Sequence, residues 1–523
     1  MNPRQRILAA IDLALGGLLA GIVLGAIVGF GGAAWWCRPI LAGATGAAAL
    51  LLLVRQLVEG RAPILKTPLG LLGLSVLALA VVQLAPLPGR LAGRLSPSAR
   101  DLYAHGVLAT LARADDPDAT PSGEAAAIRS PASLDRSGTL RGLVLAAACL
   151  GVFWCASHYV DRLQRLYLIW GAVIAGFLLN AALAAVQLSA GTAGFFGFIA
   201  PGAGPWWSPS VNDLLDAPAV VSLRNLPTTQ APGAVAGAAL GVAEPFTFGT
   251  LPGGSGGFLA LGALALPLAL AVVLRLLAPL GGRETTLDRL TRSGHGGLIV
   301  LLSILLVTGS VLVGLVAGPW FAVPFAVGLA MLGIPALLLV PGARWAGLGA
   351  STILIGCLAL GAGLQARWID LTGAEPPVRA PDWETNRAVW GDAARIFAEF
   401  RLVGVGLGNF GTAQPFFKDR DLASTTAMSS LFQWGAETGL AGLAILGLAG
   451  LWSVARLPGG LARLGAMDRF LALGLLGAVA GFSLLAVVHW TVELPAVAIA
   501  ASALGGTWNR WLAGGADLFV ERE

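Results

Sequence analysis

Residues 297–340 read GLIVLLSILLVTGSVLVGLVAGPWFAVPFAVGLAMLGIPALLLV, a stretch of 44 residues without a charged side chain. A helix that crosses a bilayer needs about 20 mainly apolar residues, so this stretch is long enough for two helices. Gly318 and Pro319 divide it, either as a short loop or as a kink. The stretch therefore predicts two spans in a membrane, near 297–317 and 320–340.

The rest of the chain has the same character. Of its 523 residues, 56% are hydrophobic and only 12% are charged, and the mean hydropathy is +0.79. A water-soluble protein of this size needs more charge to cover its surface. We therefore predict an all-α, polytopic membrane protein with about twelve spans, near 7–30, 39–54, 68–86, 140–157, 165–188, 257–280, 297–317, 320–340, 346–365, 429–454, 469–490 and 494–512.

The first span argues against a cleaved signal peptide, and the cysteines argue against a metal site. The apolar run from Ile7 to Phe30 is too long for the core of a signal peptide, which favours a retained signal anchor. The four cysteines form no CxxC pair and no cluster with histidine, so no metal site is expected. The net charge of +5 is better explained by arginine in cytoplasmic loops than by binding of nucleic acid.

Charge in the short loops gives an orientation. With the N-terminus inside, every short inside loop is basic, as the positive-inside rule requires. Both termini are then cytoplasmic, and the inside residues are Arg55, Arg61, Lys66, Arg162, Arg165, Arg283, Arg289, Arg292, Arg344, Arg456, Arg463, Arg469, Arg510 and Arg522. Three long segments face outward: 87–139, which is polar and expected to be partly disordered, 189–256 and 366–428.

The third outward segment contains a helical pattern. Apolar residues recur at helical spacing in it, namely Trp390, Ala393, Ala394, Phe397 and Phe400. The predicted opposite face carries Asp392, Arg395 and Glu399. This pattern predicts an amphipathic helix that lies on the membrane surface or caps a cavity. No strand pattern and no internal repeat is visible in the chain.

The same segment carries a family resemblance. Residues 386–417 read NRAVWGDAARIFAEFRLVGVGLGNFGTAQPFF, and residues 427–448 read AMSSLFQWGAETGLAGLAILGL. They resemble the signature of the bacterial O-antigen ligase and O-antigen polymerase superfamily, in which an arginine and a glycine-rich turn precede a His-Asn pair and an E-x-G-x-x-G helix start. Weaker similarities cover 81–99, 245–270 and 487–506.

The resemblance implies a function. Such enzymes transfer a glycan from a polyprenyl-pyrophosphate lipid to an acceptor hydroxyl, on the periplasmic side of the bacterial inner membrane and without a metal or other cofactor. The acceptor is lipid A core, a growing glycan or a protein. Arginine suits the pyrophosphate because its guanidinium is planar and always charged. Histidine suits the base that deprotonates the acceptor.

Three family motifs are replaced in this chain. Met428 and Ser429 stand where the family has His-Asn, and Pro252 to Gly257 contain no amide where it has Asn-x-Asn. Residues 312–321 have no cation where many members have an arginine. Two explanations stay open: a divergent enzyme, or a non-catalytic member that binds lipid-linked glycan or an assembly partner. A secondary transporter also fits twelve helices, but repeat symmetry and charge pairs within the membrane are not visible.

The candidate site residues follow from the motif and from the outward segments. Arg387 is the first candidate for binding the anionic substrate. The alternative is that its side chain extends to the lipid headgroups. Arg367, Arg401 and Arg224 are lesser candidates, for which simple solvation is favoured.

Glu437 is either a functional carboxylate or an interfacial cap at a helix start. Gly406 and Gly408, with Gly404, resemble a phosphate-binding turn, and a tight turn explains them equally well. His489 and Glu493 have the spacing of neighbours on one helix face, for which a structural pair is favoured.

Overall fold

The computed structural model describes residues 3–60, 67–103, 130–190, 196, 220–222, 247–252, 255–277, 296–340, 344–372, 383–418, 422–465 and 468–514. Each of the twelve predicted spans overlaps a long helix. These helices are α1 (Pro3–Val28), α2 (Cys37–Glu59), α3 (Pro68–Leu84), α6 (Arg136–Tyr159), α7 (Leu163–Ala190), α10 (Gly256–Leu277), α12 (Gly296–Phe321), α13 (Val323–Leu339), α14 (Arg344–Ala366), α18 (Ser430–Ala462), α19 (Asp468–Val488) and α20 (Pro495–Leu512).

Nine helices in the described part of the chain are long and apolar enough to cross a membrane. α3 and α13 are apolar but shorter, at 17 residues each. Many large apolar side chains on these helices are exposed, among them Leu13, Leu57, Leu338 and Leu451. Apolar surface of this extent needs lipid or another protein to cover it. The chain is therefore a multi-pass membrane protein.

The remaining elements are short. They are η1 (Phe30–Gly32), α4 (Gly89–Leu95), α15 (Trp368–Thr372), α16 (Trp383–Glu399) and α17 (Phe410–Phe417). Strand β1 (Val220–Ser222) pairs antiparallel with β4 (Leu422–Ser424), and β2 (Thr247–Phe248) pairs antiparallel with β3 (Leu251–Pro252). Strands of two or three residues are too short to show an alternating pattern in the sequence.

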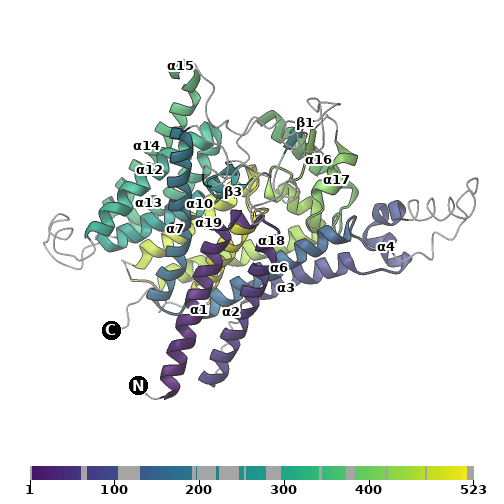
Figure 1. Cartoon of the computed structure of the whole chain (residues 1–523), viewed down its shortest axis with the longest axis horizontal. Helices are drawn as coiled ribbons and strands as arrows, with labels where there is room; N and C mark the ends of the chain where they lie inside the picture. Colours follow the sequence, from purple (N-terminus) through teal and green to yellow (C-terminus); the bar gives the residue numbers. More distant parts are fainter. Residues whose placement is uncertain are drawn as a thin grey trace, which may run out of the picture.

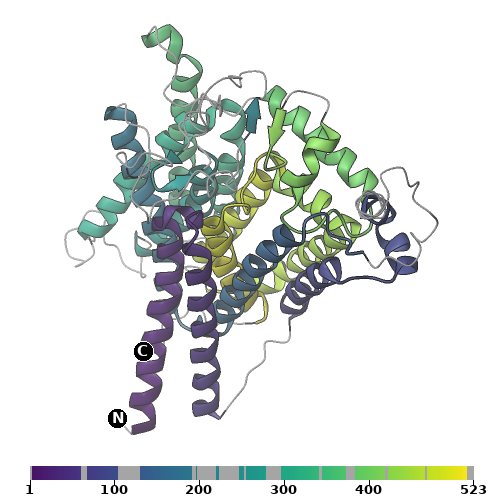
Figure 2. The same ribbon diagram turned by 45° about the vertical axis from the view of Figure 1, so that its right-hand side comes forward.

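Helix α10 is the centre of the fold. Every residue from Gly256 to Ala271 is buried, because α7, α12, α13 and α19 all pack against it. A helix that is apolar on all sides is stable only when other helices surround it. In Figure 1, α12, α13 and α14 lie on one side of this centre, and α3, α6 and α18 on the other. Figure 2 shows α1 and α2 side by side, projecting beyond the rest.

The break predicted at Gly318 is a kink. Gly318 has φ +66° and ψ −178° inside α12, and helical hydrogen bonding resumes when the N–H of Ala322 donates to the carbonyl of Gly318. Of the outward segment 87–139, residues 104–129 lie outside the described residues. The described remainder is structured, since it contains α4 and a bridge between Leu87 and Ser130.

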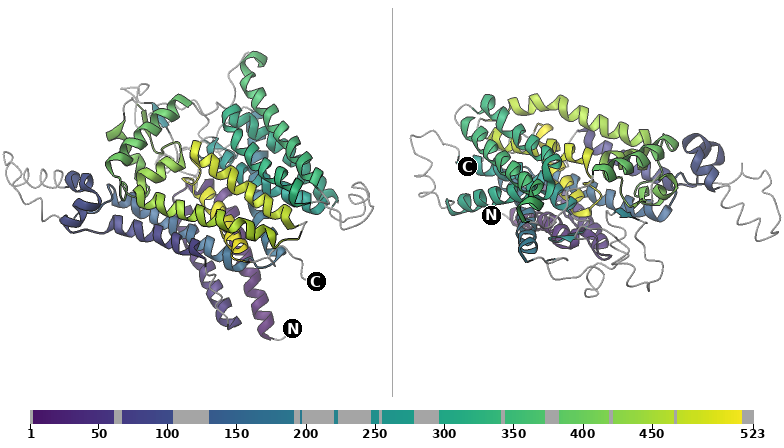
Figure 3. Two further views of the ribbon diagram at one scale, coloured as in Figure 1. Left: turned by 180° about the vertical axis from the view of Figure 1, so that it is seen from behind. Right: turned by 90° about the horizontal axis from the view of Figure 1, so that it is seen from above.

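Several of the helix ends that carry the basic loops meet on one side. Asp12 of α1 forms an ion pair with Arg55 of α2 at 2.8 Å and accepts a hydrogen bond from Arg165 of α7 at 2.5 Å, and Asp161 lies 2.9 Å from Arg165. This cluster is a charge network at the ends of apolar helices, a feature that sequence analysis did not find. Its members come from three helices and one loop, so no local pattern predicts it. In the left view of Figure 3, α1 and α2 project beyond the rest, with the N-terminus at the free end of α1.

Candidate functional site

The glycine-rich turn, residues 401–410, is inserted into a break in α18. The break is at Gly439, which has φ +63°. The carbonyl of Arg401 accepts from the N–H of Leu440 at 2.7 Å, and that of Leu402 accepts from Ala441 at 3.1 Å. The turn therefore supplies the acceptors that a new helix start needs. The span predicted near 429–454 is in fact two helical pieces joined at this point.

Glycine is required where the turn touches α18. Gly404 has φ +71°, and a Cβ there would lie 2.2 Å from the carbonyl carbon of Glu437. Beyond it, Val405 donates to the carbonyl of Ala436 at 3.0 Å, and Gly406 donates to that of Glu437 at 3.1 Å. The turn and the first piece of α18 are thus in direct backbone contact. At position 404 the approach is so close that only a residue without a side chain fits.

Glu437 holds the far end of the turn. Its carboxylate accepts from the N–H of Gly408 at 2.7 Å and from that of Phe410 at 3.2 Å, and the Gln433 amide donates to it at 3.0 Å. The side chain is buried, with 4% of its surface exposed. Because the N–H groups of Gly406 and Gly408 donate within the protein, they are not available to a phosphate. This geometry is that of a tight turn fixed by a carboxylate.

Two buried amides that sequence analysis missed complete the turn. Gln83, at the end of α3, donates to the carbonyls of Val403 at 2.6 Å and Glu437 at 2.8 Å, and accepts from the N–H of Leu407 at 3.1 Å. Asn409 donates to Ser133 Oγ at 2.9 Å. These contacts join segments about 270 to 350 residues apart in the sequence, and no local signal could have shown them.

The start of α6 is fixed beside the turn. Asp135 caps the helix, accepting from the N–H groups of Ser137 at 2.8 Å and Gly138 at 3.0 Å. Burial opposes ionisation of this carboxyl, but the hydrogen bonds from Ser137 and Gly138 outweigh it and lower the pKa of Asp135. A negative charge at a helix start is favourable. The cap places Arg141, on the next turn of α6, at the edge of a cavity.

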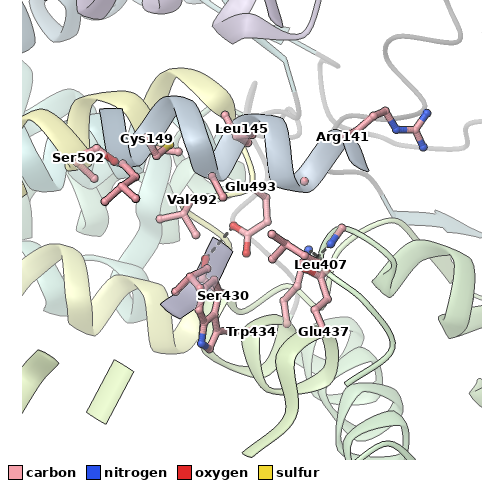
Figure 4. A pocket seen from close by; sticks show the side chains of 18 of the residues that line it. Arg141, Leu145, Cys149, Leu407, Ser430, Trp434, Glu437, Val492, Glu493 and Ser502 are labelled. Atoms are coloured by element: carbon pink, nitrogen blue, oxygen red, sulfur yellow. Dashed lines mark hydrogen bonds between the residues drawn. The ribbon is translucent and has the colours of Figure 1, made fainter. Parts of the chain in front are cut away.

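This cavity has a volume of about 560 Å³ and lies between α3, α6, α18 and α20 (Figure 4). Four acidic or basic side chains line it: Arg38 at the start of α2, Arg141 near the start of α6, Glu437 in α18 and Glu493 between α19 and α20. Away from these groups its wall is mainly apolar, with Leu69, Val76, Leu150, Phe153, Ala501 and Gly505. The cavity is therefore amphiphilic, with charge at one end and hydrocarbon along its length.

The cavity is long. It follows α6 from Gly138 to Phe153, which is about 22 Å at 1.5 Å per residue. Over that length it has room for a hydrocarbon chain. A cavity of this shape suits a ligand with a charged head and a long apolar tail.

His489 and Glu493 do not form the predicted pair. α19 ends at Val488 and α20 begins at Pro495, so residues 489–494 are a linker and the helical spacing does not apply. His489 Nδ1 is 3.0 Å from the carbonyl of Trp490, and burial lowers its pKa to about 4. Glu493 Oε2 instead accepts from Ser430 Oγ at 2.8 Å. Pro495 starts the next helix.

The predicted arginines do not line the cavity. Arg387, Arg401 and Arg367 are all exposed, and Arg401 Nε donates to the carbonyl of Ala398 at 2.8 Å. Arg224 lies outside the described residues. Of the predicted set, the structure brings together Glu437, Gly406 and Gly408, and of these Glu437 and Gly408 line the cavity.

Helix α16 exists as predicted, and its buried face is partly as predicted, since Ala393 and Phe400 are buried. Asp392, expected on the polar face, is buried and accepts from the Gln414 amide at 2.7 Å, whereas Ala394 is exposed. The buried face is shifted around the helix because Val389 and Ile396 pack into a small core with α17 and the glycine-rich turn. α16 therefore packs against the protein through this face, and Trp390 stacks on Phe432 at the start of α18.

Arg38 and Arg141 are the cations that sequence reasoning missed. Both lie at a helix start that the sequence predicts to face outward, Arg38 at the start of α2 and Arg141 near the start of α6. Arginine at an end predicted to face outward runs against the positive-inside bias, and that departure is the signal that could have identified them. In Figure 4 the Arg141 side chain extends outward from the cavity rim.

Met428 occupies the position where the family has histidine. It has φ +53°, a left-handed conformation that is uncommon outside glycine. Its carbonyl accepts from the Trp390 indole at 3.2 Å, and its side chain packs at the junction of two apolar cores. A thioether cannot take up a proton at neutral pH, so this position supplies no base.

No group of three His, Cys, Asp or Glu side chains able to hold a metal ion occurs within the described ranges. No protein-family model matches the chain, and no curated protein matches it.

Proposed function

We propose that the chain is a glycan ligase or polymerase of the O-antigen ligase type. It takes a glycan from a polyprenyl-pyrophosphate lipid and joins it to an acceptor hydroxyl on the periplasmic side of a bacterial inner membrane. The long helices form twelve spans, and both termini are cytoplasmic. The observation that carries the proposal is the amphiphilic cavity beside the glycine-rich turn and Glu437.

The shape and charge of the cavity support a lipid-linked donor. An isoprenoid chain fits the apolar length along α6 and α20, and the pyrophosphate then lies at the charged end near Arg38 and Arg141. Guanidinium groups bind such anions through paired, charge-assisted hydrogen bonds. The sugar projects past Arg141 toward the turn, which is where an acceptor in the periplasm can reach it.

The positions of charged residues support the orientation. Arg55, Arg165 and Arg469 lie at the helix ends opposite the cavity mouth, where Arg469 donates to the carbonyl of Leu339 at 2.6 Å. Basic residues at these ends are typical of a cytoplasmic face. The turn, α16 and the charged end of the cavity are then periplasmic.

A non-catalytic lipid-glycan binder is the second candidate, and Met428 is the observation that favours it. A protein that only binds donor needs the cavity and its cations but no base. The secondary transporter has less support. Transporters use the exposed start of a broken helix to bind substrate, whereas the break in α18 is already occupied by the carbonyls of Arg401 and Leu402.

The test is turnover of a polyprenyl-pyrophosphate-linked glycan by full-length protein in membrane vesicles that contain native acceptors, measured as release of polyprenyl pyrophosphate. We expect Arg141→Gln to reduce turnover at least 10-fold. The matched control is Arg136→Gln, an exposed arginine on the same helix that does not line the cavity. Failure of the wild-type protein to consume the donor, while still binding it, favours the binder.

A further inference from the structure

Two carboxyl groups line the charged end of the cavity, and they are held differently. Both oxygens of Glu437 accept hydrogen bonds, Oε2 from Gly408 and Oε1 from Phe410 and Gln433. For Glu493, Ser430 Oγ donates to Oε2 at 2.8 Å, the N–H of Thr491 donates to the same oxygen at 2.7 Å, and the backbone N–H of Glu493 also interacts with the carboxylate. Glu437 is thus committed to the turn, whereas the hydrogen bonds that other residues make to Glu493 reach only Oε2.

The surroundings of Glu493 fix its direction. It lies in the linker between α19 and α20, and Ser430 belongs to the first turn of α18. Ser430 Oγ is also 3.0 Å from Thr491 Oγ1 and 2.8 Å from the Thr491 N–H. Figure 4 shows the Glu493 carboxylate among Ser430, Leu407 and Leu145, inside the ring of lining side chains. A carboxylate fixed in this way is positioned like a catalytic group.

We propose that Glu493 is the proton acceptor of this site, a role that rests on the proposed glycan transfer. Glu493 Oε1 takes the proton of the acceptor hydroxyl. The acceptor oxygen then forms a bond to the anomeric carbon of the donor sugar, and the bond from that carbon to the pyrophosphate oxygen breaks. Polyprenyl pyrophosphate leaves with the electron pair, and protonated Glu493 returns its proton to water at the cavity mouth.

The electrostatics around Glu493 agree with this role. Burial raises the pKa of Glu493, and the hydrogen bonds from Ser430 and Thr491 act against that rise. The other ionisable groups that line or adjoin the cavity are Arg38 on α2, Arg141 and Cys149 on α6, Glu437 on α18 and His489 on the linker. A base with a pKa nearer neutrality transfers protons more effectively in both directions.

The first variant is Glu493→Gln, which keeps the size of the side chain and an acceptor for Ser430 and Thr491. We expect it to bind the polyprenyl-pyrophosphate-linked glycan within 3-fold of wild type and to lower turnover at least about 100-fold. The control is Glu399→Gln, the same change at an exposed carboxylate on α16 that does not line the cavity. We expect wild-type turnover from it.

The second variant is Ser430→Ala, which tests the protonation of Glu493 rather than the stability of the protein. The Ser430 hydroxyl lowers the pKa of Glu493, so its removal raises that pKa. The acid limb of the pH profile of turnover should therefore move to higher pH, an effect that loss of stability alone does not produce.

The outcomes separate the two proposals. If the wild-type protein turns over donor and Glu493→Gln is also active, only the role of Glu493 is overturned. The same holds if the wild-type protein is active and Ser430→Ala does not move the acid limb of the pH profile. No turnover by the wild-type protein overturns the proposed transfer, and the role of Glu493 with it. If Glu493→Gln does not fold, the acid limb in Ser430→Ala decides the question.

Discussion

The Glu437 carboxylate accepts a hydrogen bond from the backbone N–H of Gly408 at 2.7 Å, across 29 positions of sequence. This contact closes the glycine-rich turn onto the broken helix α18. It also places both residues on the wall of the cavity. The glycine-rich turn and the E-x-G helix start are thus adjacent in space, and both contribute to the cavity wall.

Glu437→Gln should destabilise the protein. A carboxylate accepts from Gly408, Phe410 and Gln433 together, whereas an amide presents one oxygen and turns its NH₂ toward another donor. Leaving a buried N–H without an acceptor costs about 1–3 kcal/mol. Unfolding of the detergent-solubilised protein by denaturant measures the loss, with the exposed Glu399→Gln as control. Equal stability of the two variants would show that the carboxylate is not needed for the turn.

Gly404→Ala should be more harmful than an ordinary glycine substitution. The added Cβ meets the backbone of Glu437 and Thr438, and φ +71° is strained for alanine, so we expect a loss of at least about 2 kcal/mol. Gly391→Ala in α16 is the matched control, because its Cβ meets nothing within 4 Å. There alanine should be neutral or stabilising by about 0.5–1 kcal/mol. The prediction fails if thermal unfolding of the two variants is alike.

Asp135→Ala should cost about 1 kcal/mol at neutral pH through loss of the α6 cap. The pKa of Asp135 is lowered by folding, so its stabilisation is complete above about pH 4, the unfolded value. It is lost as pH falls through the lower folded value. The stability difference between wild type and Asp135→Ala should therefore shrink in acid. A difference that is the same at pH 7 and at low pH would contradict the assigned cause.

Asp12→Asn should weaken the packing of α1 against α2 and α7. It removes one of the partners of Arg55 and Arg165, whose side chains are only 9% and 10% exposed. Removing one member of a buried pair costs about 3–5 kcal/mol, and the expected loss lies below that range because Arg55 keeps Glu59 and both arginines keep Asp161. Asp370→Asn on α15, where the side chain is exposed, should change stability little. Similar melting of both variants would show that the network is dispensable.

The positions of the helices could be predicted because membrane thickness sets their length. The run 297–340 is long enough for two helical pieces, and the adjacent Gly318 and Pro319 near its middle marked the break between them. The cavity could not be predicted. Arg38, Arg141, Gln83 and Glu493 approach Glu437 only after the long helices have packed, and contacts between such distant segments leave no periodic signal in the chain.

The prediction of the buried face of α16 was only partly right, for a related reason. Its pattern contains two adjacent stripes of small or apolar residues, and the composition alone favoured the one with Trp390 and Phe397. The stripe with Val389 and Ile396 is buried because α17 covers it, and Gln414 supplies the hydrogen bond that makes burial of Asp392 tolerable. Packing of a partner element therefore decided which face is inside.

The most direct test of the amphiphilic cavity is equilibrium binding of polyprenyl pyrophosphate to the full-length protein in lipid nanodiscs. Ala146 lines the cavity, and its neighbour Ala147 on α6 is exposed and does not. We predict saturable binding to the wild-type protein and to Ala147→Phe, and binding at least 10-fold weaker to Ala146→Phe, whose ring fills the path of the apolar tail. Absence of wild-type binding, or equal affinity of the two phenylalanine variants, would contradict the account.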